Sequence, residues 1–414
     1  MKVNFLFRIL KKIIPENLKK NSFLRKGLAL IANIFYGFPA KKLFLIGVTG
    51  TTGKTTTAFM IKKILDDGGI TTGLISTAGY FLKNEVIPVM SQGPGTTPDP
   101  FYLNSLLRRM VKEGIKVAVI EVSSFGLMYW RVYGFPFKVA VLTNIDYNHH
   151  VKLHGSMDNY VKEKLKLFRM LKPQDLAVLP RESKYFELFK NNTQARLKPF
   201  DLEQNQDWQL QLKISSKFNI LNALAAINAV SDFPLNKEQI KKSLESIESI
   251  PGRGEFINSS ASFKIIVDKA NTPLAFQNII DWIKNDLKPE KTIAVYGTFN
   301  ESPLEEREKL AQLATDFFDL TIITEDDPKN EAPDQGIKDF LQFAKKNQIH
   351  PNKYLTIVDR REAIKEALSR AAKNDLVIIL GRGNEKLMYY KNKAVPFDDR
   401  EVVQDILKEF HYLS

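Results

Sequence analysis

Cysteine is absent from this chain of 414 residues, and only five of its residues are histidine. The absence of cysteine excludes disulfides, thiolate zinc sites and cysteine nucleophiles, and it is typical of a reducing compartment. A run long enough to cross a membrane is also missing from the amino-terminal region. Its longest uncharged stretch, residues 27–40, has 14 residues and contains Gly and Pro, whereas a spanning helix needs about 20.

Acidic residues are nearly absent from residues 1–42, where ten Lys and Arg stand against Glu16 alone. This segment therefore supplies +9 of the net charge of +13. The rest of the chain is close to neutral, so a nucleic-acid-binding role spread over the whole protein is not indicated. At about 100–200 residues per domain, the length predicts two or three domains, each with its own core.

The amino-terminal segment has apolar residues at helical spacing between Phe5 and Ile14, with Arg8, Lys11 and Lys12 between them. A signal peptide is not expected, because basic residues interrupt the apolar run and no small-residue cleavage site follows. Two interpretations stay open. One is an interfacial helix that rests on anionic lipid headgroups, which would place a cytoplasmic protein at the membrane. The other is a helical arm packed on the next domain with its lysines in water.

From residue 43 onward the pattern alternates between buried strands and amphipathic helices, which predicts crossover units and a parallel sheet. The predicted strands and helices before Pro251 are 43–49, 55–65 (helix), 72–77, 117–122, 139–143 and 219–230 (helix). Those after it are 263–267, 292–296, 304–317 (helix), 320–324, 355–358, 362–372 (helix) and 376–380. We expect a basic amphipathic segment at 1–42, a central ATP-binding domain at 43–250 and a carboxyl-terminal Rossmann-like domain at 251–414, the last two of the α/β class.

The most specific motif is Gly47–Thr56, GVTGTTGKTT, between a predicted strand and a predicted helix. Glycines let the backbone wrap a phosphate, and the N–H groups at the start of the helix point toward it. Lys54 would neutralise phosphate charge, and the Thr55 hydroxyl would bind Mg²⁺. The alternative is a Gly/Thr turn that only caps a helix. The strand-to-helix context favours a nucleotide-binding loop.

An acid and a histidine cluster follow the next strands. Glu121 ends a buried strand, a place from which a carboxylate can hold Mg²⁺ or its water, or accept hydrogen bonds from a helix start. His149, His150 and His154 lie within six residues, although histidine is rare in the chain. This clustering indicates a site, and metal ligation and hydrogen bonding to a substrate both remain open for it.

Taken in order, these motifs resemble those of the Mur ligase family, the ATP-dependent ligases of peptidoglycan precursor synthesis. The resemblance is greatest to the member that adds the third peptide residue to a UDP-N-acetylmuramyl-dipeptide. It covers about residues 44–414. The matching motifs are 49–56 (TGTTGKTT), 96–98 (TTP), 121–127 (EVSSFGL), 143–168, 218–222 (FNILN), 251–253 (PGR), 326–328 (DDP) and 381–385 (GRGNE).

The resemblance implies a role for each matching residue. The nucleotide would be bound by Gly50, Thr51, Thr52, Gly53, Lys54, Thr55, Thr56, Asn222, Arg253, Asp268 and Lys269. The metal ligands would be Thr55, Glu121, His149 or His150, and Lys164. The catalytic residues would be Lys54, Glu121, Lys164, His149 and His150. The substrates would be held by Thr96, Thr97, Ser123, Ser124, Asn144, His154, Asp326, Asp327, Lys329, Gly381 and Glu385. Lys164 falls where the family carries a carbamylated lysine, a carboxylate-like anion that can bind a second Mg²⁺.

Three departures concern the substrates. Residues 1–42 are too few for the family's first domain, which binds the UDP end of the substrate, so the resemblance implies that this domain is missing. Lys329 stands where the member that uses diaminopimelate has an arginine, and a lysine lacks the planar bidentate contact to a carboxylate. Asn384 replaces a histidine of the family motif. The motifs that bind ATP in the family are thus retained, whereas those that bind the amino acid are altered.

The resemblance therefore implies a ligase that uses ATP and Mg²⁺ to join a muramyl-dipeptide carboxylate to an amino acid through an acyl phosphate. Two alternatives remain. The chain could ligate a different carboxylate, such as that of a lipid-linked muropeptide, since the UDP-binding domain is not found. It could also be a regulatory homologue that binds ATP without ligating.

Overall fold

The computed structural model describes residues 21–83, 85–89, 96–146, 150–214, 216–298, 302–391 and 393–413. These residues form two compact units. Unit 1 comprises the described parts of 1–147, 153–212 and 218–246, and unit 2 those of 148–152, 213–217 and 247–414. The periodicity predicted between Phe5 and Ile14 lies outside the described residues.

Unit 1 is built on an eight-stranded sheet with the order β4-β3-β2-β5-β1-β6-β7-β8. The six strands from β2 to β8 in this order are parallel, and β3 and β4 extend one edge in antiparallel fashion. The strands are β1 (Phe44–Thr49), β2 (Thr72–Ser76), β3 (Gly79–Phe81), β4 (Val86–Ile87), β5 (Val117–Glu121), β6 (Phe137–Leu142), β7 (Leu176–Pro180) and β8 (Arg196–Phe200).

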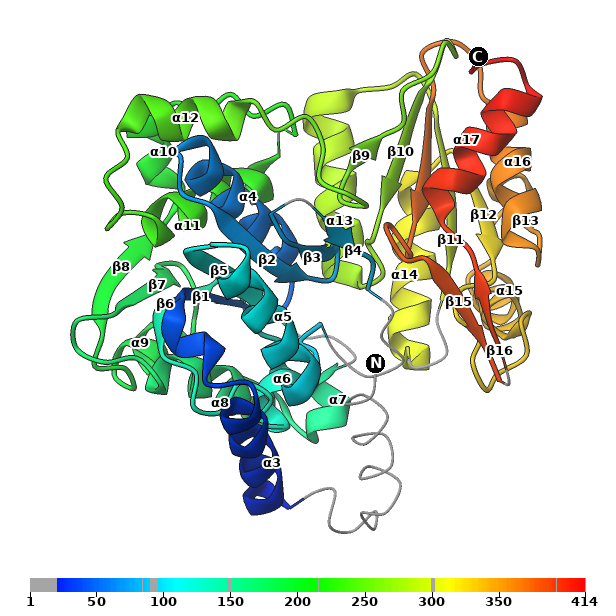
Figure 1. The fold of residues 1–414 in the computed structure, drawn as a ribbon. Helices are drawn as coiled ribbons and strands as arrows, with labels where there is room; N and C mark the ends of the chain where they lie inside the picture. Colours follow the sequence, from blue (N-terminus) through cyan, green and yellow to red (C-terminus); the bar gives the residue numbers. More distant parts are fainter. Residues whose placement is uncertain are drawn as a thin grey trace. The chain divides into compact units, whose positions relative to one another are not determined.

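Helices cover both faces of this sheet (Figure 1). The helices are α3 (Ser22–Phe35), α4 (Lys54–Asp67), α5 (Pro100–Lys112), α6 (Ser124–Met128), α8 (Met157–Arg169), α9 (Phe186–Lys190), α10 (Asn205–Trp208) and α12 (Lys237–Glu245), with the short turns η1 (Pro39–Lys42) and η2 (Leu202–Gln204). Helices α7 (His150–His154) and α11 (Lys217–Ala229) contain residues of both units. Because β5, VAVIE, is buried at every position, it is a central strand covered on both faces.

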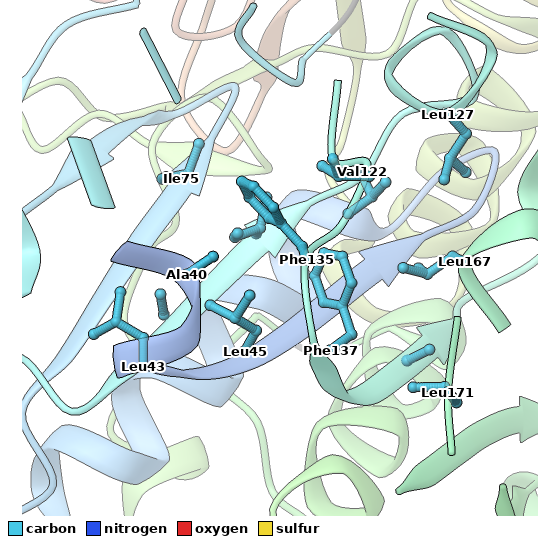
Figure 2. Packing of buried hydrophobic residues seen from close by; sticks show 14 of the residues in the cluster. Ala40, Leu43, Leu45, Ile75, Val122, Leu127, Phe135, Phe137, Leu167 and Leu171 are labelled. Atoms are coloured by element: carbon cyan, nitrogen blue, oxygen red, sulfur yellow. The ribbon is translucent and has the colours of Figure 1, made fainter. Parts of the chain in front are cut away.

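The core of unit 1 lies between the sheet and the helices α5, α8 and α9. Figure 2 shows its centre, where Phe137 of β6 lies beside Leu45 of β1 and Leu167 of α8. Gly47 of β1 passes under this ring, and a Cβ atom there would be 3.0 Å from the Phe137 ring and 3.1 Å from Leu167. The strand that leads to the phosphate loop is therefore fixed by close packing.

Unit 2 contains a six-stranded sheet with the order β13-β12-β11-β14-β10-β9, parallel except for β9. Its strands are β9 (Glu255–Phe256), β10 (Lys264–Asp268), β11 (Thr292–Gly297), β12 (Leu320–Thr324), β13 (Tyr354–Thr356) and β14 (Leu376–Leu380), followed by the hairpin β15 (Leu387–Tyr390) and β16 (Lys393–Pro396). Its helices are α13 (Pro273–Trp282), α14 (Leu304–Phe317), α15 (Gln335–Lys346), α16 (Arg360–Arg370) and α17 (Asp399–Glu409), with the turns η3 (Ile283–Leu287) and η4 (Pro351–Lys353). Helices α16 and α17 pack on one face, and α13, α14 and α15 lie on the other (Figure 1).

The predicted α/β class with two mainly parallel sheets is confirmed. The strand predicted at 139–143 begins two residues earlier, at Phe137, which pairs with Leu45. The sequence pattern did not indicate this start because Lys138 interrupts the apolar run. The sequence analysis did not predict β7 and β8. Strand β8, RLKPF, lies at a sheet edge, where charges and proline are common and hide the strand pattern.

The described part of the amino-terminal segment is largely helical. Helix α3 begins after Asn21, whose side chain accepts hydrogen bonds from the N–H groups of Phe23 and Leu24. It packs on α5 through Ala29, Ala32 and Asn33, as the helical-arm interpretation predicts for this part. Among the described residues, none of the helices has the length and apolar character needed to span a membrane.

Candidate functional site

In unit 1, the phosphate loop follows β1 and leads into α4. Two of its glycines have positive φ angles, 153° at Gly50 and 78° at Gly53. A Cβ atom at Gly50 would be 1.9 Å from Thr143 Oγ1, and one at Gly53 would be 2.3 Å from Asn222 Oδ1. Both positions therefore require glycine, for backbone conformation and for space.

The charge of Lys54 lies over this loop. Its Nζ atom donates hydrogen bonds to the carbonyl oxygens of Gly50, at 3.0 Å, and of Thr51, at 2.9 Å. The ammonium is therefore placed against the backbone that would wrap a phosphate chain, at the amino end of α4. Thr56 is buried in the first turn of the same helix.

Two residues after β6 hold the loop in shape. Thr143 Oγ1 donates to the Thr52 carbonyl at 2.6 Å. The Asn144 side chain accepts from Thr52 N–H and donates to Thr52 Oγ1, both at 3.0 Å, and its carbonyl accepts from Thr51 N–H at 3.0 Å. The structure thus places Asn144, a predicted substrate contact, against the phosphate loop. On α11, Asn222 accepts a hydrogen bond from Thr57 Oγ1 at 3.2 Å, which ties that helix to α4.

A line of oxygen donors lies beside the loop. Thr55 Oγ1 and Thr77 Oγ1 are 2.9 Å apart, and Thr77 N–H donates to Glu121 Oε1 at 3.3 Å. The Glu121 side chain is buried at the carboxyl end of β5. A carboxylate with nearby hydroxyls is the oxygen set that Mg²⁺ prefers, and this ion usually takes one or two protein carboxylates plus phosphate oxygens. Among the residues that the structure describes, no group of three His, Cys, Asp or Glu side chains suited to a metal occurs.

Lys164 of α8 is fully buried and reaches the same loop. Its Nζ atom donates to the Gly50 carbonyl at 2.8 Å and lies 4.3 Å from the centre of the Tyr160 ring. Burial, and then the charge of Lys54, lower the pKa of Lys164 well below its ordinary value. Both effects act against the charged form of this amine.

His154 and the serines of the EVSS segment form a buried hydrogen-bonded group. His154 Nε2 is 3.1 Å from Ser124 Oγ, and its ring stacks on Phe125 with a centroid distance of 5.0 Å. Burial, with smaller effects of Lys164 and Lys166, lowers the pKa of His154 to about 4. The imidazole is thus neutral at neutral pH.

The remaining predicted contacts of unit 1 stabilise the end of β5. Thr97 Oγ1 donates to the Glu121 carbonyl at 3.0 Å and accepts from Ser123 N–H at 2.9 Å. Ser123 caps α6 through a hydrogen bond from Gly126 N–H at 3.0 Å. Thr96 is partly buried next to Thr97. His149 and the side chain of His150 lie outside the described part of the chain, so their roles stay predictions.

In unit 2, Asp268 joins the end of β10 to the turn at residues 251–254. Its carboxylate accepts from Gly254 N–H and Ala270 N–H, both at 2.6 Å. Burial raises the pKa of Asp268, while Arg253 and these hydrogen bonds oppose the rise. The next residue, Lys269, forms an ion pair with Glu385 at 2.5 Å. Burial by itself would raise the pKa of Glu385, but Lys269 and Arg382 lower it overall.

A buried arginine organises the rest of the predicted amino-acid site. Arg382 is fully buried, and its Nη1 atom donates to Asp326 Oδ1 at 2.9 Å and to Asp327 Oδ1 at 2.8 Å. Its Nη2 atom donates to the Leu387 carbonyl at 2.7 Å. Gly381 has a φ of 115°, and a Cβ atom there would be 2.6 Å from Asp326 Oδ2. Asp326 and Asp327 are thus anchored to the loop after β14.

The loop after β12 has an uncommon backbone. Asp327 and Lys329, on either side of Pro328, have φ angles of 40° and 48°. Non-glycine residues adopt such angles where the surroundings enforce them. Here Tyr389 N–H donates to Asp327 Oδ1 at 3.0 Å and Lys329 N–H donates to the Tyr389 carbonyl at 2.8 Å, so the β15–β16 hairpin holds the loop.

The sequence analysis missed four residues that the structure places in these sites: Thr77, Tyr160, Arg360 and Arg382. Three had a visible signal, and one of these, Tyr160, lies in the 143–168 segment that resembles the family. Thr77 follows a buried strand, and Arg382 lies inside the GRGNE motif directly after β14. Arg360 had none, because an arginine at the start of a helix is ordinarily solvated.

Two family models match this chain. Residues 48–208 match the Mur ligase middle domain, and residues 252–383 match the model described as Mur ligase, glutamate ligase domain. Among curated relatives, the UDP-N-acetylmuramoyl-L-alanyl-D-glutamate--2,6-diaminopimelate ligase of Clostridium botulinum is 33% identical over 94% of this chain and 83% of its own length. The protein of the same name from Caldanaerobacter subterraneus is 32% identical over 93% of this chain and 82% of its own length.

Solved structures share the fold. A UDP-N-acetylmuramoyl-L-alanyl-D-glutamate--2,6-diaminopimelate ligase matches with a TM-score of 0.61 and 23% identity over 96% of this chain and 84% of that one. The folylpolyglutamate synthase of Mycobacterium tuberculosis complexed with ADP and AMPPCP matches with a TM-score of 0.68 and 16% identity over 86% and 92%. At these identities the structural likeness concerns the fold.

Proposed function

Because the chain belongs to the Mur ligase family and is an ATP-dependent acid–amino-acid ligase of peptidoglycan precursor synthesis, we propose that it joins UDP-N-acetylmuramoyl-L-alanyl-D-glutamate to diaminopimelate. The names of its 33% and 32% identical relatives support these substrates. The observation that carries the ATP half is that Lys54 and Lys164 both contact the Gly50 carbonyl of the phosphate loop, while Glu121 is linked to Thr55 through Thr77. We place the reaction in the cytoplasm, where ATP is available.

We propose that unit 1 activates the substrate carboxylate. A carboxylate oxygen attacks the γ-phosphorus of ATP, and the bond from this phosphorus to the bridging β-phosphate oxygen breaks. ADP departs, and the carboxylate has become an acyl phosphate. Lys54 offsets phosphate charge, and Thr55 and Glu121 would hold Mg²⁺, which neutralises charge on the transferred group when bound. Gly50, Thr51, Thr52 and Gly53 supply the loop around the phosphates. The buried, neutral His154 beside Ser124 would offer a hydrogen bond to the substrate without adding charge.

We further propose that Lys164 carries a carbamate. A neutral amine adds to the carbon of CO₂ and loses a proton, which turns a cation into an anion. Complete burial and the lowered pKa of Lys164 favour the neutral amine that this addition needs. The oxygens of the carbamate would extend the oxygen donors of Thr55 and Glu121 toward a second Mg²⁺.

Unit 2 would bind the amine substrate. In this proposal the amine nitrogen attacks the acyl carbon, phosphate leaves, and an amide forms. Glu385 and the Asp326–Asp327 loop are the candidate contacts for the ammonium groups of diaminopimelate, and Lys329 is the candidate cation for its distal carboxylate. The domain limits 43–250 and 251–414 and the nucleotide contacts Arg253, Asp268 and Lys269 belong to the same proposal.

One observation favours a second amine. Lys329, the candidate cation for the distal carboxylate, holds a carboxylate as a point charge and lacks arginine's planar fork. Lysine, which has no distal carboxylate, is therefore the competing substrate.

The test is phosphate release by the full chain with ATP, Mg²⁺ and UDP-N-acetylmuramoyl-L-alanyl-D-glutamate, with diaminopimelate, with lysine or without an amine. We expect release that requires both the dipeptide and diaminopimelate. Lys54→Ala should lower the rate by about 10³-fold or more, because charge neutralisation dominates phosphoryl transfer, whereas the control variant Lys62→Ala on the same helix should retain it. Release with the dipeptide and lysine, but not with the dipeptide and diaminopimelate, would identify lysine as the amine substrate. ATP binding without amine-dependent release in any arm would refute the proposed ligation of this dipeptide.

A further inference from the structure

Helix α3 docks on unit 1 through its small and polar residues. Ala29, Ala32 and Asn33 are buried, and Asn33 donates to the Tyr133 carbonyl at 3.0 Å and accepts from Asn104 Nδ2 at 2.9 Å. Both hydrogen bonds join residues far apart in the sequence, one to a backbone carbonyl and one to a side chain. The helix is therefore fixed in rotation about its axis.

This rotation presents five of the large apolar side chains of α3 to solvent. Phe23, Leu30, Ile31, Ile34 and Phe35 are 86%, 44%, 55%, 58% and 54% exposed. They recur at the spacing of one helical stripe, which we call the apolar stripe. A helix on a globular protein normally buries such a stripe and solvates its polar side. In α3 the order is reversed, and the helix lies at the lower edge of unit 1 in Figure 1.

A pocket continues the apolar stripe at its carboxyl end. It has a volume of about 370 Å³ and is lined by apolar side chains, Ile34 and Phe35 of the stripe and Val111 of α5. It is also lined by three basic side chains, Lys42, Arg108 and Lys112. Apolar surface therefore lies next to a group of cations. An anionic lipid is complementary to this combination, because its negative headgroup lies next to its acyl chains.

We propose that the apolar stripe and this pocket form a docking surface for a bilayer that contains anionic lipid. The stripe would enter the boundary between headgroups and acyl chains, and Lys42, Arg108 and Lys112 would contact the phosphates. Charge complementarity selects this occupant over a second copy of the chain. Residues 21–42 contain four basic residues and no acidic one, so a symmetric pair of these surfaces would bring like charges together. This proposal is independent of the substrates named above.

The experiment is flotation of the full chain with vesicles of phosphatidylcholine alone or of equal parts phosphatidylcholine and phosphatidylglycerol. The double variant Ile31→Gln/Ile34→Gln removes two exposed apolar groups of the stripe, and Arg108→Gln/Lys112→Gln removes two cations of the pocket. The matched control is Leu188→Gln/Leu341→Gln, which changes two leucines that are each 41% exposed on other helices. Thermal unfolding and ATP binding of every variant are measured in parallel to exclude misfolding.

We expect binding to the phosphatidylglycerol vesicles that falls as salt is raised, and about tenfold weaker binding by each stripe or pocket variant. The control variant should bind like the parent chain. Equal binding to both vesicle types, or unchanged binding by Ile31→Gln/Ile34→Gln, would overturn the proposal, since the contact would then lie elsewhere. Absence of vesicle binding together with a dimer in sedimentation that the same variant dissociates would assign the surface to a second copy.

Discussion

At the scale of single residues, burial decides the chemistry of unit 1. Lys164 and His154 are both buried, and burial lowers the pKa of each. Burial thus acts against the charged form of both side chains, whereas Lys54 contacts the Gly50 and Thr51 carbonyls of the phosphate loop. This difference suits a site that must accommodate the negative charge of the ATP phosphates together with that of the substrate carboxylate.

The carbamate on Lys164 is testable directly. We expect the full chain in ¹³C-bicarbonate to give a carbamate carbon signal that disappears in Lys164→Arg, since a guanidinium is never neutral in a protein. The matched control is Lys162→Arg, an exposed position on the same helix. A signal that survives in Lys164→Arg, or its absence from the parent chain at saturating bicarbonate, would contradict the modification. Loss of amine-dependent phosphate release in Lys164→Arg would not by itself show whether the reaction needs the carbamate or the unmodified lysine.

At the scale of elements, unit 2 contains an ion pair that ties two helices to the end of one strand. Arg360, at the start of α16, forms a fully buried bidentate pair with Asp399 of α17, at 2.7 and 2.8 Å. The same guanidinium donates to the Leu380 carbonyl at 2.9 Å, next to Gly381. It thereby fixes the end of β14, from which Arg382 reaches Asp326 and Asp327.

Breaking this pair should destabilise unit 2 strongly. Arg360→Met leaves the buried carboxylate of Asp399 without its cation, so we expect a loss of about 3–5 kcal/mol in the free energy of unfolding. The control Lys365→Met removes an exposed partner of Glu409 on the same helix and should cost about 1 kcal/mol or less. Urea unfolding followed by Trp282 fluorescence, in a Trp130→Phe/Trp208→Phe background, reports on unit 2. Equal losses for the two variants would show that the buried pair has no special weight.

At the scale of the whole molecule, the two units carry separable parts of the proposed reaction. The phosphate loop with Lys54 belongs to unit 1, and the proposed amine contact Glu385 belongs to unit 2. Each set is held by contacts inside its own unit. A variant in one set should therefore change one substrate's binding without altering the other's.

Glu385→Gln tests this separation. Removing the carboxylate charge should raise the KM for the amine by about tenfold, because hydrogen bonds to charged groups contribute about 1.5–3 kcal/mol. The affinity for a fluorescent ATP analogue should stay that of the parent chain, whereas Lys54→Ala should lower it. The exposed Glu401→Gln is the control in the same unit. A changed ATP affinity with an unchanged KM for the amine would remove Glu385 from the amine site.

The sequence by itself determined the parts that are local in the chain. Buried strand runs such as Val117–Glu121, and the glycines and Lys54 between β1 and α4, act through backbone conformation and neighbours a few residues away. Their spacing therefore predicted both parallel sheets and the phosphate loop. Even the missed strand β8 has a local reason, since an edge strand tolerates charge and proline.

Only the tertiary structure decided which side chains meet. Lys164 reaches Gly50 across 114 positions of sequence, and Arg382 reaches Asp326 across 56. It also decided that α3 buries Ala29, Ala32 and Asn33 and exposes its larger apolar residues. Periodicity identifies the two sides of a helix, but which side is covered depends on the shape and hydrogen-bonding groups of the surface it meets. Here the close approach to α5 and the bond to Asn104 require small and polar residues at the contact.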